Sequence, residues 1–100
     1  MYRGTTPTLT FTLPFESHRI TGLNLSFAQQ EQVLLEKTLP DCVAEGNTLQ
    51  VTLTEAETLL FDDQKGMVEM QLRVGCGKSR MASKVMRICV ERILKDGCLV

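Results

Sequence analysis

Residues 67–74 constrain the fold more than any other stretch, because apolar and polar side chains alternate there without interruption. The apolar members of this run are Val68, Met70, Leu72 and Val74. A period of two residues is typical of a β-strand that buries one face. Gly75 and Gly77 follow, and they allow a tight reversal because glycine accepts positive φ angles. The chain then returns through residues 81–90, so the sequence predicts two long neighbouring strands here.

Shorter strand patterns fill the first half of the chain. Threonine and other polar residues alternate with leucine, phenylalanine or valine, and β-branched and aromatic side chains favour a pleated surface. The predicted strands cover residues 8–13, 20–28, 32–38, 42–44 and 48–53. Turn residues such as Pro14, Pro40 and Gly46 separate them. The apolar triplet at residues 33–35 also fits a helical turn, which periodicity alone does not exclude.

One helix start is predicted after these strands. Thr54 and Glu57 have the spacing of a capping box, in which each side chain accepts a hydrogen bond from the other residue's backbone amide. About two turns fit before the polar residues 62–65, so the sequence predicts a short helix near residues 55–61. The apolar side chains that would lay this helix across one end of the core are Leu59, Leu60 and Phe61.

The segment after the glycine turn fits two structures. At a period of 3.6 residues its apolar side chains form a helical stripe of Ala82, Val85, Met86, Cys89 and Ile93. At a period of two, one face instead carries Met86, Ile88 and Val90. Periodicity alone favours the helix. A strand over residues 81–90 is nevertheless predicted, because strands with short turns precede it and Val74 needs a neighbouring strand.

Serial strands, short turns and one brief helix predict a single all-β domain over residues 1–100. The expected fold is a small immunoglobulin-like antiparallel β-sandwich of about seven strands, with the short helix near residues 55–61. The chain has no Trp, and its only Tyr is Tyr2, so it lacks the tryptophan and tyrosine-corner features of true immunoglobulin domains. The sandwich is therefore inferred from the number and order of the strands.

Charge and hydropathy exclude several classes of partner. One hundred residues are enough to bury one core without a metal or a disulfide. A formal net charge of -1 and a pI of 5.8 create no field that would attract nucleic acid or an anionic membrane. The chain has no apolar run of about 18 residues and no apolar segment after Met1, so neither a transmembrane helix nor a signal peptide is expected.

Four cysteines are irregularly spaced, at Cys42, Cys76, Cys89 and Cys98. Structural zinc sites draw on closely spaced pairs of Cys or His ligands, whereas this chain has no C-x-x-C pair and a single histidine. No metal site is therefore predicted. Reduced thiols are expected, with Cys42 and Cys89 acting as small apolar fillers.

The sequence Gly77-Lys78-Ser79 after a strand fits the end of a phosphate-binding loop. Such a loop needs another glycine five positions before its second one, because consecutive backbone amides must curl around the phosphate. Leu72 occupies that position, inside the predicted strand. A chain filled with short strands also has no room for the crossovers of a parallel sheet. We therefore expect a plain turn and no nucleotide or other cofactor.

Adjacent polar pairs at residues 17–18 and 41–42 do not amount to a catalytic site. Ser17-His18 and Asp41-Cys42 supply possible nucleophiles, but such a site needs a base aimed at the nucleophile and a third group that orients the base. His18 lies in a predicted surface loop. The expectation is therefore a solvated histidine, with no catalytic residue and no enzymatic activity.

Two clusters of like charge are also interpreted as solvated surface. The acidic cluster consists of Glu55, Glu57, Asp62 and Asp63, and it lacks the loop of alternating carboxylates around a glycine that calcium requires. The basic cluster consists of Lys78, Arg80, Lys84, Arg87 and Arg92. Because no aromatic residues are interleaved with it and the chain is not basic overall, no nucleic-acid site is expected.

The apolar content of the strands exceeds what one small core demands. Residues 33–35 and 87–90 would present apolar side chains on both faces of a strand. An exposed apolar edge in a small β-domain indicates a partner surface or a risk of aggregation. This pattern predicts a subunit of an assembly.

Several short pieces stand in order along nearly the whole chain: Arg3-Gly4-Thr5-Thr6-Pro7, Leu9-Phe11-Leu13, Pro14-Phe15, Glu36-Lys37, Gly46-Asn47-Thr48, Leu53-Thr54, Gln71 with Arg73, Ala82-Ser83-Lys84 and Ile93-Leu94. In these pieces the chain is similar to a family of small proteins encoded by phages and prophages of Gram-positive bacteria. In general outline the chain also resembles the immunoglobulin-like N-terminal domain of phage baseplate upper proteins. It departs from a full baseplate protein by ending at Val100 without a stalk or receptor-binding part.

The resemblance implies a virion structural or assembly protein of the tail or baseplate that acts through protein contacts. Other phage structural proteins, or further copies of the same chain, would be its partners, with no nucleic-acid or membrane partner. The resemblance also implies a strand over residues 81–90, and a location in the host cytoplasm during assembly and then in the virion. It carries over no catalytic, cofactor-binding or metal-binding residue. The competing hypotheses are a free-standing module that binds a cell-surface glycan or a protein, and a small nucleotide-binding protein.

Overall fold

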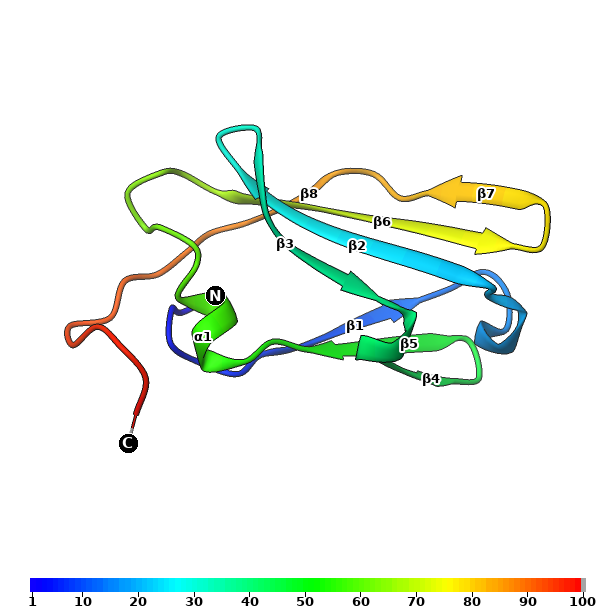
Figure 1. Cartoon of the computed structure of the whole chain (residues 1–100), viewed down its shortest axis with the longest axis horizontal. Helices are drawn as coiled ribbons and strands as arrows, with labels where there is room; N and C mark the ends of the chain where they lie inside the picture. Colours follow the sequence, from blue (N-terminus) through cyan, green and yellow to red (C-terminus); the bar gives the residue numbers. More distant parts are fainter. Residues whose placement is uncertain (100) are drawn as a thin grey trace.

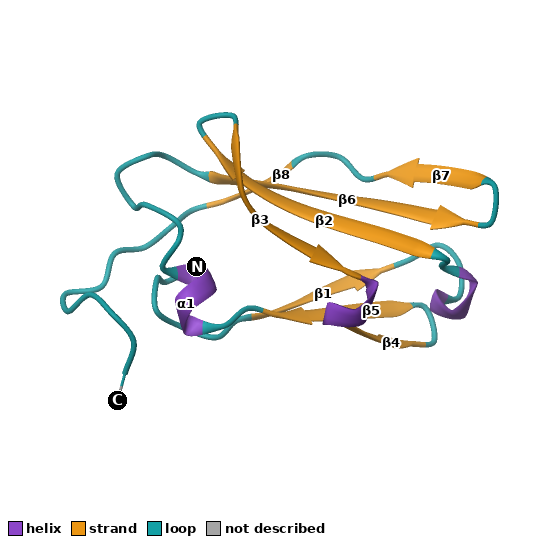
Figure 2. Cartoon of the chain, viewed as in Figure 1, coloured by secondary structure: helices purple, strands orange, loops and turns teal. Residues whose placement is uncertain are grey.

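The computed structural model describes residues 1–99, which form eight strands, one short α-helix and two single turns of 3₁₀ helix (Figures 1 and 2). The strands are β1 (Thr8–Thr12), β2 (Gly22–Gln29), β3 (Gln32–Thr38), β4 (Cys42–Glu45), β5 (Thr48–Thr52), β6 (Val68–Cys76), β7 (Ser79–Ala82) and β8 (Met86–Ile88). The helix is α1 (Glu55–Thr58), and the 3₁₀ turns are η1 (Ser17–Arg19) and η2 (Leu39–Asp41). The predicted antiparallel β-sandwich is confirmed.

The strands form two antiparallel sheets that lie face to face (Figure 2). One sheet has the order β1-β5-β4, and the other has the order β3-β2-β6, with β7 and β8 both on the far side of β6. In the constant-type immunoglobulin arrangement the second strand shares a sheet with the first and the fifth. Here β2 pairs with β3 and β6 instead, so the central pair of the larger sheet is β2 with β6.

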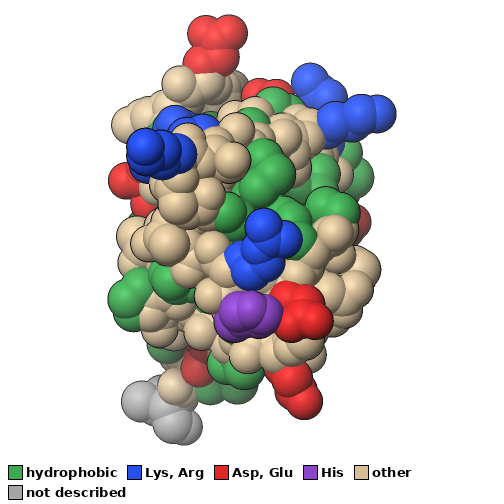
Figure 3. Space-filling model, turned by 90° about the vertical axis from the view of Figure 1, so that its right-hand side faces the viewer, with side chains coloured by type: hydrophobic (Ala, Val, Ile, Leu, Met, Phe, Trp, Pro, Cys, Tyr) green, Lys and Arg blue, Asp and Glu red, His purple; other side chains and the backbone are tan. Residues whose placement is uncertain are grey.

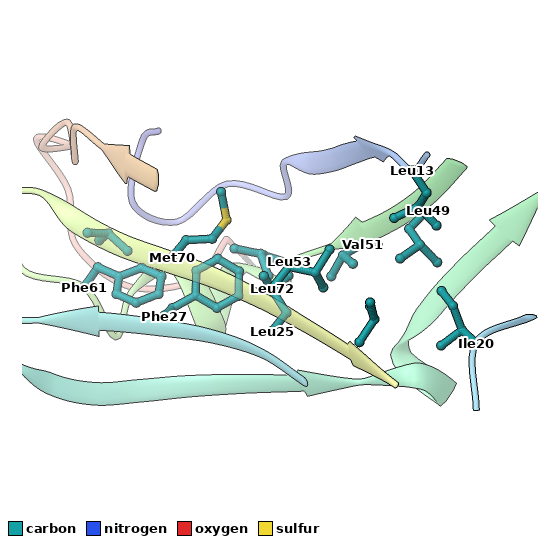
Figure 4. Packing of buried hydrophobic residues seen from close by; sticks show 12 residues of the cluster. Leu13, Ile20, Leu25, Phe27, Leu49, Val51, Leu53, Phe61, Met70 and Leu72 are labelled. Atoms are coloured by element: carbon teal, nitrogen blue, oxygen red, sulfur yellow. The ribbon is translucent and has the colours of Figure 1, made fainter. Parts of the chain in front are cut away.

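Apolar side chains from the two inner faces fill the space between the sheets (Figure 4). The buried members are Leu13, Ile20, Leu25, Phe27, Leu49, Val51, Leu53, Phe61, Val68, Met70, Leu72 and Val74. The rings of Phe27 and Phe61 pack in a tilted arrangement with centroids 5.9 Å apart. The alternation predicted over residues 67–74 is confirmed, because every apolar residue of that run from Val68 onward is buried.

The strand predicted over residues 81–90 is present but broken in two. β7 begins at Ser79, β8 ends at Ile88, and residues 83–85 interrupt the pairing with β6. At the break, the Leu72 amide donates to the Ser83 hydroxyl (3.0 Å), while the Ser83 amide donates to the Leu72 carbonyl (2.8 Å). The serine side chain thus replaces a backbone acceptor. Because the break divides the predicted strand into β7 and β8, the described residues form eight strands where about seven were expected. The helical alternative for this segment is wrong.

The capping box at the start of α1 is confirmed, but the helix is shorter than predicted. The Glu57 amide donates to the Thr54 hydroxyl (3.1 Å), and the Thr54 amide donates to the Glu57 carboxylate (2.8 Å). The helix ends at Thr58 and not near residue 61. After Leu59 the hydrogen bonds span three residues and not four, since the Leu60 amide donates to the Glu57 carbonyl (3.1 Å) and the Phe61 amide donates to the Thr58 carbonyl (3.4 Å). The Arg3 guanidinium then donates to the carbonyls of Leu59 (3.2 Å) and Phe61 (2.6 Å), which have no partner within the helix.

The three apolar residues after α1 do not share the role predicted for them. Phe61 is fully buried, whereas Leu60 is half exposed and Leu59 only partly buried. Only Phe61 therefore belongs to the buried core at this end of the sandwich. No helix among residues 1–99 is both long and apolar enough to cross a membrane.

Candidate functional site at the open edge of the sandwich

The two sheets of the sandwich differ in width. Three strands of the smaller sheet face four strand positions of the larger one, since β7 and β8 share the outermost position. On one side, β3 passes directly into β4 through the three residues of η2, which joins the layers there (Figure 1). The surplus position of the larger sheet therefore lies on the opposite side, beyond β1.

A groove of about 540 Å³ opens between β1 and the surplus strands. We call this groove the open edge, and it is lined by residues 10–15, Leu72, Val74, residues 81–83 and Met86. Met81 and Met86 pair with the core residues Val74 and Met70, so their side chains are directed toward the inside of the sandwich. Met81 is nevertheless 39% exposed, because the smaller sheet has no strand opposite it.

The backbone of β1 is unpaired along the open edge, since β1 pairs only with β5 among the described strands. The Leu13 amide donates to the Asn47 carbonyl (2.7 Å) and the Leu53 amide donates to the Pro7 carbonyl (3.0 Å). Hydrogen-bonded positions alternate in an antiparallel pair, so Leu9 and Phe11 also face β5. The backbone groups of the remaining residues point outward, and these are Thr8, Thr10 and Thr12.

The edge of β1 lacks the features that usually prevent strand addition. Its sequence, Thr-Leu-Thr-Phe-Thr, contains no charge and no proline, and its register with β5 has no bulge. The edge strands on the opposite side are different: β3 contains Glu36 and Lys37 beside a bulge, and β4 ends at Glu45. An apolar groove beside an unprotected strand edge is a surface that can accept a further strand by backbone hydrogen bonds and side-chain burial.

The turn predicted at Gly77-Lys78-Ser79 is confirmed. Cys76 pairs with Ser79, so a two-residue loop joins β6 and β7, and Gly77 has a φ of +59° that glycine adopts without steric cost. The Lys78 side chain is exposed. A hairpin connects these antiparallel strands, whereas a phosphate-binding loop connects a strand to a helix.

The structure separates the members of the pair Ser17-His18. Ser17 is buried, and its hydroxyl donates to the Gly46 carbonyl (2.8 Å). His18 is exposed, and its Nδ1 lies 3.1 Å from a carboxylate oxygen of Glu16. Figure 3 shows this histidine beside acidic side chains at one end of the molecule. The imidazole is therefore not directed at the Ser17 hydroxyl.

The pair Asp41-Cys42 is structural as well. The Asp41 carboxylate accepts hydrogen bonds from the Thr38 amide (2.9 Å) and hydroxyl (3.2 Å), and these bonds lower the pKa of Asp41. Burial raises the pKa of the Cys42 thiol, which donates to the Thr38 carbonyl (3.5 Å). A raised pKa keeps the thiol protonated and disfavours nucleophilic attack.

The predicted charge clusters are dispersed. Among residues 1–99 no group of three or more metal-ligating side chains comes together. Within the acidic cluster, Glu57 pairs with Lys37, and Glu55 accepts from the Leu99 amide (2.9 Å). Within the basic cluster, Arg80 donates to the carbonyl of Gly77 (2.6 Å) in its own turn.

Cysteine burial differs in part from the prediction. Cys42 is partly buried against the core, as expected, and Cys76 also packs there. Cys89 was predicted as an apolar filler, and this is wrong because it is exposed, like Cys98. Cys89 follows directly after β8, where no strand covers it. No cysteine within the described chain forms a disulfide.

The apolar excess predicted from the sequence is present, but the main exposed site lies elsewhere. Val33 is 54% exposed on β3, yet Leu34 and Leu35 both pack against the core. In the segment 87–90 only Ile88 and Val90 pack there. The open edge instead combines residues 10–15 with residues from the segment 81–86. The sequence pattern predicts a strand in each segment but does not indicate that the two lie beside each other.

Comparison with protein-family models, curated proteins and solved structures finds no match to this chain. The function proposed below therefore rests on the geometry of the open edge, together with the expectation stated from the sequence.

Proposed function

We propose that the protein is a non-enzymatic structural or assembly component of a phage or prophage particle, associated with the tail or baseplate. It would act in the host cytoplasm during assembly and then within the virion. Its partners are other structural proteins, and they bind at the open edge. The observation that carries this proposal is the apolar groove beside the unprotected backbone of β1.

Two contributions to the free energy of binding, apolar burial and backbone hydrogen bonds, support protein binding at this groove. Burial of apolar surface contributes about 25 cal/mol per Å², and the side chains available for it include Phe11, Phe15, Met81 and Met86. The outward backbone groups of β1 add hydrogen bonds that need no particular partner sequence. A neighbouring subunit that supplies an extended strand with an apolar side chain at every second residue provides both contributions.

The resemblance to phage proteins supports the biological setting. Two of the pieces that carry it, Leu9-Phe11-Leu13 and Pro14-Phe15, also line or adjoin the open edge, and a third, Ala82-Ser83-Lys84, borders it from the other sheet. The residues that resemble the family therefore overlap the proposed contact surface.

Incorporation into particles tests this function. The phage or prophage that encodes the chain is induced, particles and assembly intermediates are purified, and the protein is quantified in them by mass spectrometry. We expect the unchanged protein in these fractions, and a loss of at least tenfold for Met81→Glu, which introduces a charge into the groove. Val43→Glu is the matched control, because Val43 is 64% exposed on β4, away from the groove. Absence of the unchanged protein from every particle fraction would contradict the proposal.

A free-standing binding module is the second candidate, and one observation favours it. Two aromatic side chains, Phe11 and Phe15, are only partly buried at the groove, and aromatic faces are common in carbohydrate sites. The assembly role predicts no specific binding on a glycan array. Binding that is lost on changing Phe15→Ala would favour the module instead.

A further inference from the structure

Because the two sheets differ in width, one side of the molecule has a recess beside β1 and an overhang formed by β7 and β8. The smaller sheet ends at β1, one position short, and the larger sheet extends one position further with β7 and β8. A second body would fit against this side if it supplied one strand to the smaller sheet and left space for the overhanging strands. A second copy of this chain has both features.

We propose that two copies interlock at their open edges about a two-fold axis parallel to the strands. This inference rests on the proposed function, because it identifies the partner at the same groove. Rotation about such an axis exchanges the two layers, so the overhanging strands of each copy occupy the vacant position beside β1 of the other copy. Each layer then contains three strand positions from one copy and four from the other, without a gap.

The strand directions agree with this pairing. β1 and β7 run in opposite directions (Figure 1). A rotation about an axis parallel to the strands preserves their direction, so β1 pairs with the β7–β8 segment of the second copy in antiparallel fashion. The outward backbone groups of Thr8, Thr10 and Thr12 then have partners, and the two symmetric contacts form a closed dimer.

The side chains at the open edge also agree with this arrangement. Met81 and Met86 are directed inward from their strands, yet Met81 is 39% exposed and Met86 is only partly buried. In the interlocked dimer they face the same methionines of the second copy across the gap between the sheets, which are about 10 Å apart in such packing. Phe11 and Phe15 border this space, so the two grooves become one apolar core shared by both copies.

The alternative in which two β1 strands pair with each other is excluded by the overhang. That arrangement keeps the larger sheets of both copies in one layer, where the β7–β8 segment of each copy would need the space that the larger sheet of the other copy occupies. Pairing between two β7–β8 segments avoids this clash, but it leaves the β1 edges unpaired and the grooves open to water. The interlocked arrangement alone fills both layers.

The solution mass tests the interlocked dimer. The purified protein is measured by light scattering over a range of concentrations, with reducing agent present because Cys89 and Cys98 are exposed. We expect twice the chain mass of 11.2 kDa for the unchanged protein and for the control Val43→Glu. Met81→Glu should give the mass of one chain, because dimerisation would bury two carboxylates against each other. Circular dichroism verifies that the variants are folded.

A second variant supports the test if Met81→Glu does not fold. Thr10→Pro removes an outward amide from β1 and leaves the hydrogen bonds to β5 in place, so it should also give a folded monomer. A monomeric unchanged protein at all concentrations would overturn the interlocked dimer, as would a dimer or larger oligomer that neither variant dissociates. A monomer that is still incorporated into particles through the groove would preserve the proposed function and overturn only this inference.

Discussion

At the scale of single residues, Gln29 holds the loop that follows α1 against the end of β2. Its side chain is 2% exposed. Its amide nitrogen donates to the carbonyls of Asp62 (2.7 Å) and Gly66 (3.0 Å), and its oxygen accepts from the Asp62 amide (2.8 Å). Three backbone groups far from Gln29 in sequence thus depend on one side chain.

Replacement of Gln29 by leucine should destabilise the protein by about 2–4 kcal/mol, because it leaves buried backbone groups without partners. The matched control is Gln50→Leu, which makes the same chemical change on the exposed face of β5 and should stay within about 0.5 kcal/mol. Urea unfolding measures both free energies. Equal losses in the two variants would contradict this role of Gln29.

Lys37 is a charged residue on the inner face of a strand. It pairs with the core residue Leu25 in register, and its ammonium lies 2.5 Å from a carboxylate oxygen of Glu57. Burial raises the pKa of Glu57, but hydrogen bonds from Lys37 and Thr54 outweigh it and hold that pKa below its ordinary value. The Lys37 side chain is 11% exposed and the Glu57 side chain 21%, so loss of one partner leaves a charge that water compensates only in part.

The lowered pKa of Glu57 predicts a specific loss of stability in acid. A carboxyl whose pKa is lower in the folded state stabilises the protein above its unfolded pKa, near the ordinary value of 4.5, and this contribution disappears as the pH falls through the folded pKa. The unchanged protein should therefore lose more unfolding free energy than Glu57→Gln as the pH falls below about 5. Denaturation at several pH values measures the two slopes, and parallel curves would refute this assignment.

At the scale of elements, the turn between β2 and β3 is strained. Gln30 and Glu31 connect the strands with φ angles of 49° and 65°, which are favourable for glycine or asparagine and unfavourable for longer side chains. Two-residue hairpins need such angles because their twist must match that of the strands. The hairpin geometry therefore overrides the local preference of both residues.

Glu31→Gly should consequently stabilise the protein by about 0.5–1 kcal/mol, since glycine adopts this φ without a steric penalty. An increase of a few degrees in the melting temperature would accompany it. Gly46 also has a positive φ, of 56°. The opposite change, Gly46→Ala, should therefore lower stability by about 1 kcal/mol. A decrease in stability for Glu31→Gly would indicate that the glutamate side chain has a role that outweighs the strain.

At the scale of the whole molecule, the interlocked dimer couples folding to concentration. A ligand or subunit that binds only the folded state stabilises it by mass action. The melting temperature of the unchanged protein should therefore rise as protein concentration increases from about 1 to 100 μM, whereas that of Met81→Glu should not. Scanning calorimetry at several concentrations measures this difference, and a constant melting temperature for both proteins would contradict the dimer.

Local features of the sequence determined most of the elements. The alternation over residues 67–74, the reversal at Gly77 and the capping box of Thr54 and Glu57 were all predicted correctly. Each depends on interactions within about four residues along the chain, such as a period of two in a strand or a side chain reaching a nearby amide. Such interactions are the same in any fold that contains the element.

The tertiary structure alone decided how the strands divide between two sheets and where the open edge lies. The break at Ser83, the inward position of Lys37 and the exposure of Cys89 were not predicted, because each depends on which strand lies beside or opposite it. The same is true of Phe11 and Met81, which come from opposite ends of the chain. Side chains in an alternating strand are buried only if another layer covers them, and the unequal widths of the two sheets leave this pair partly uncovered.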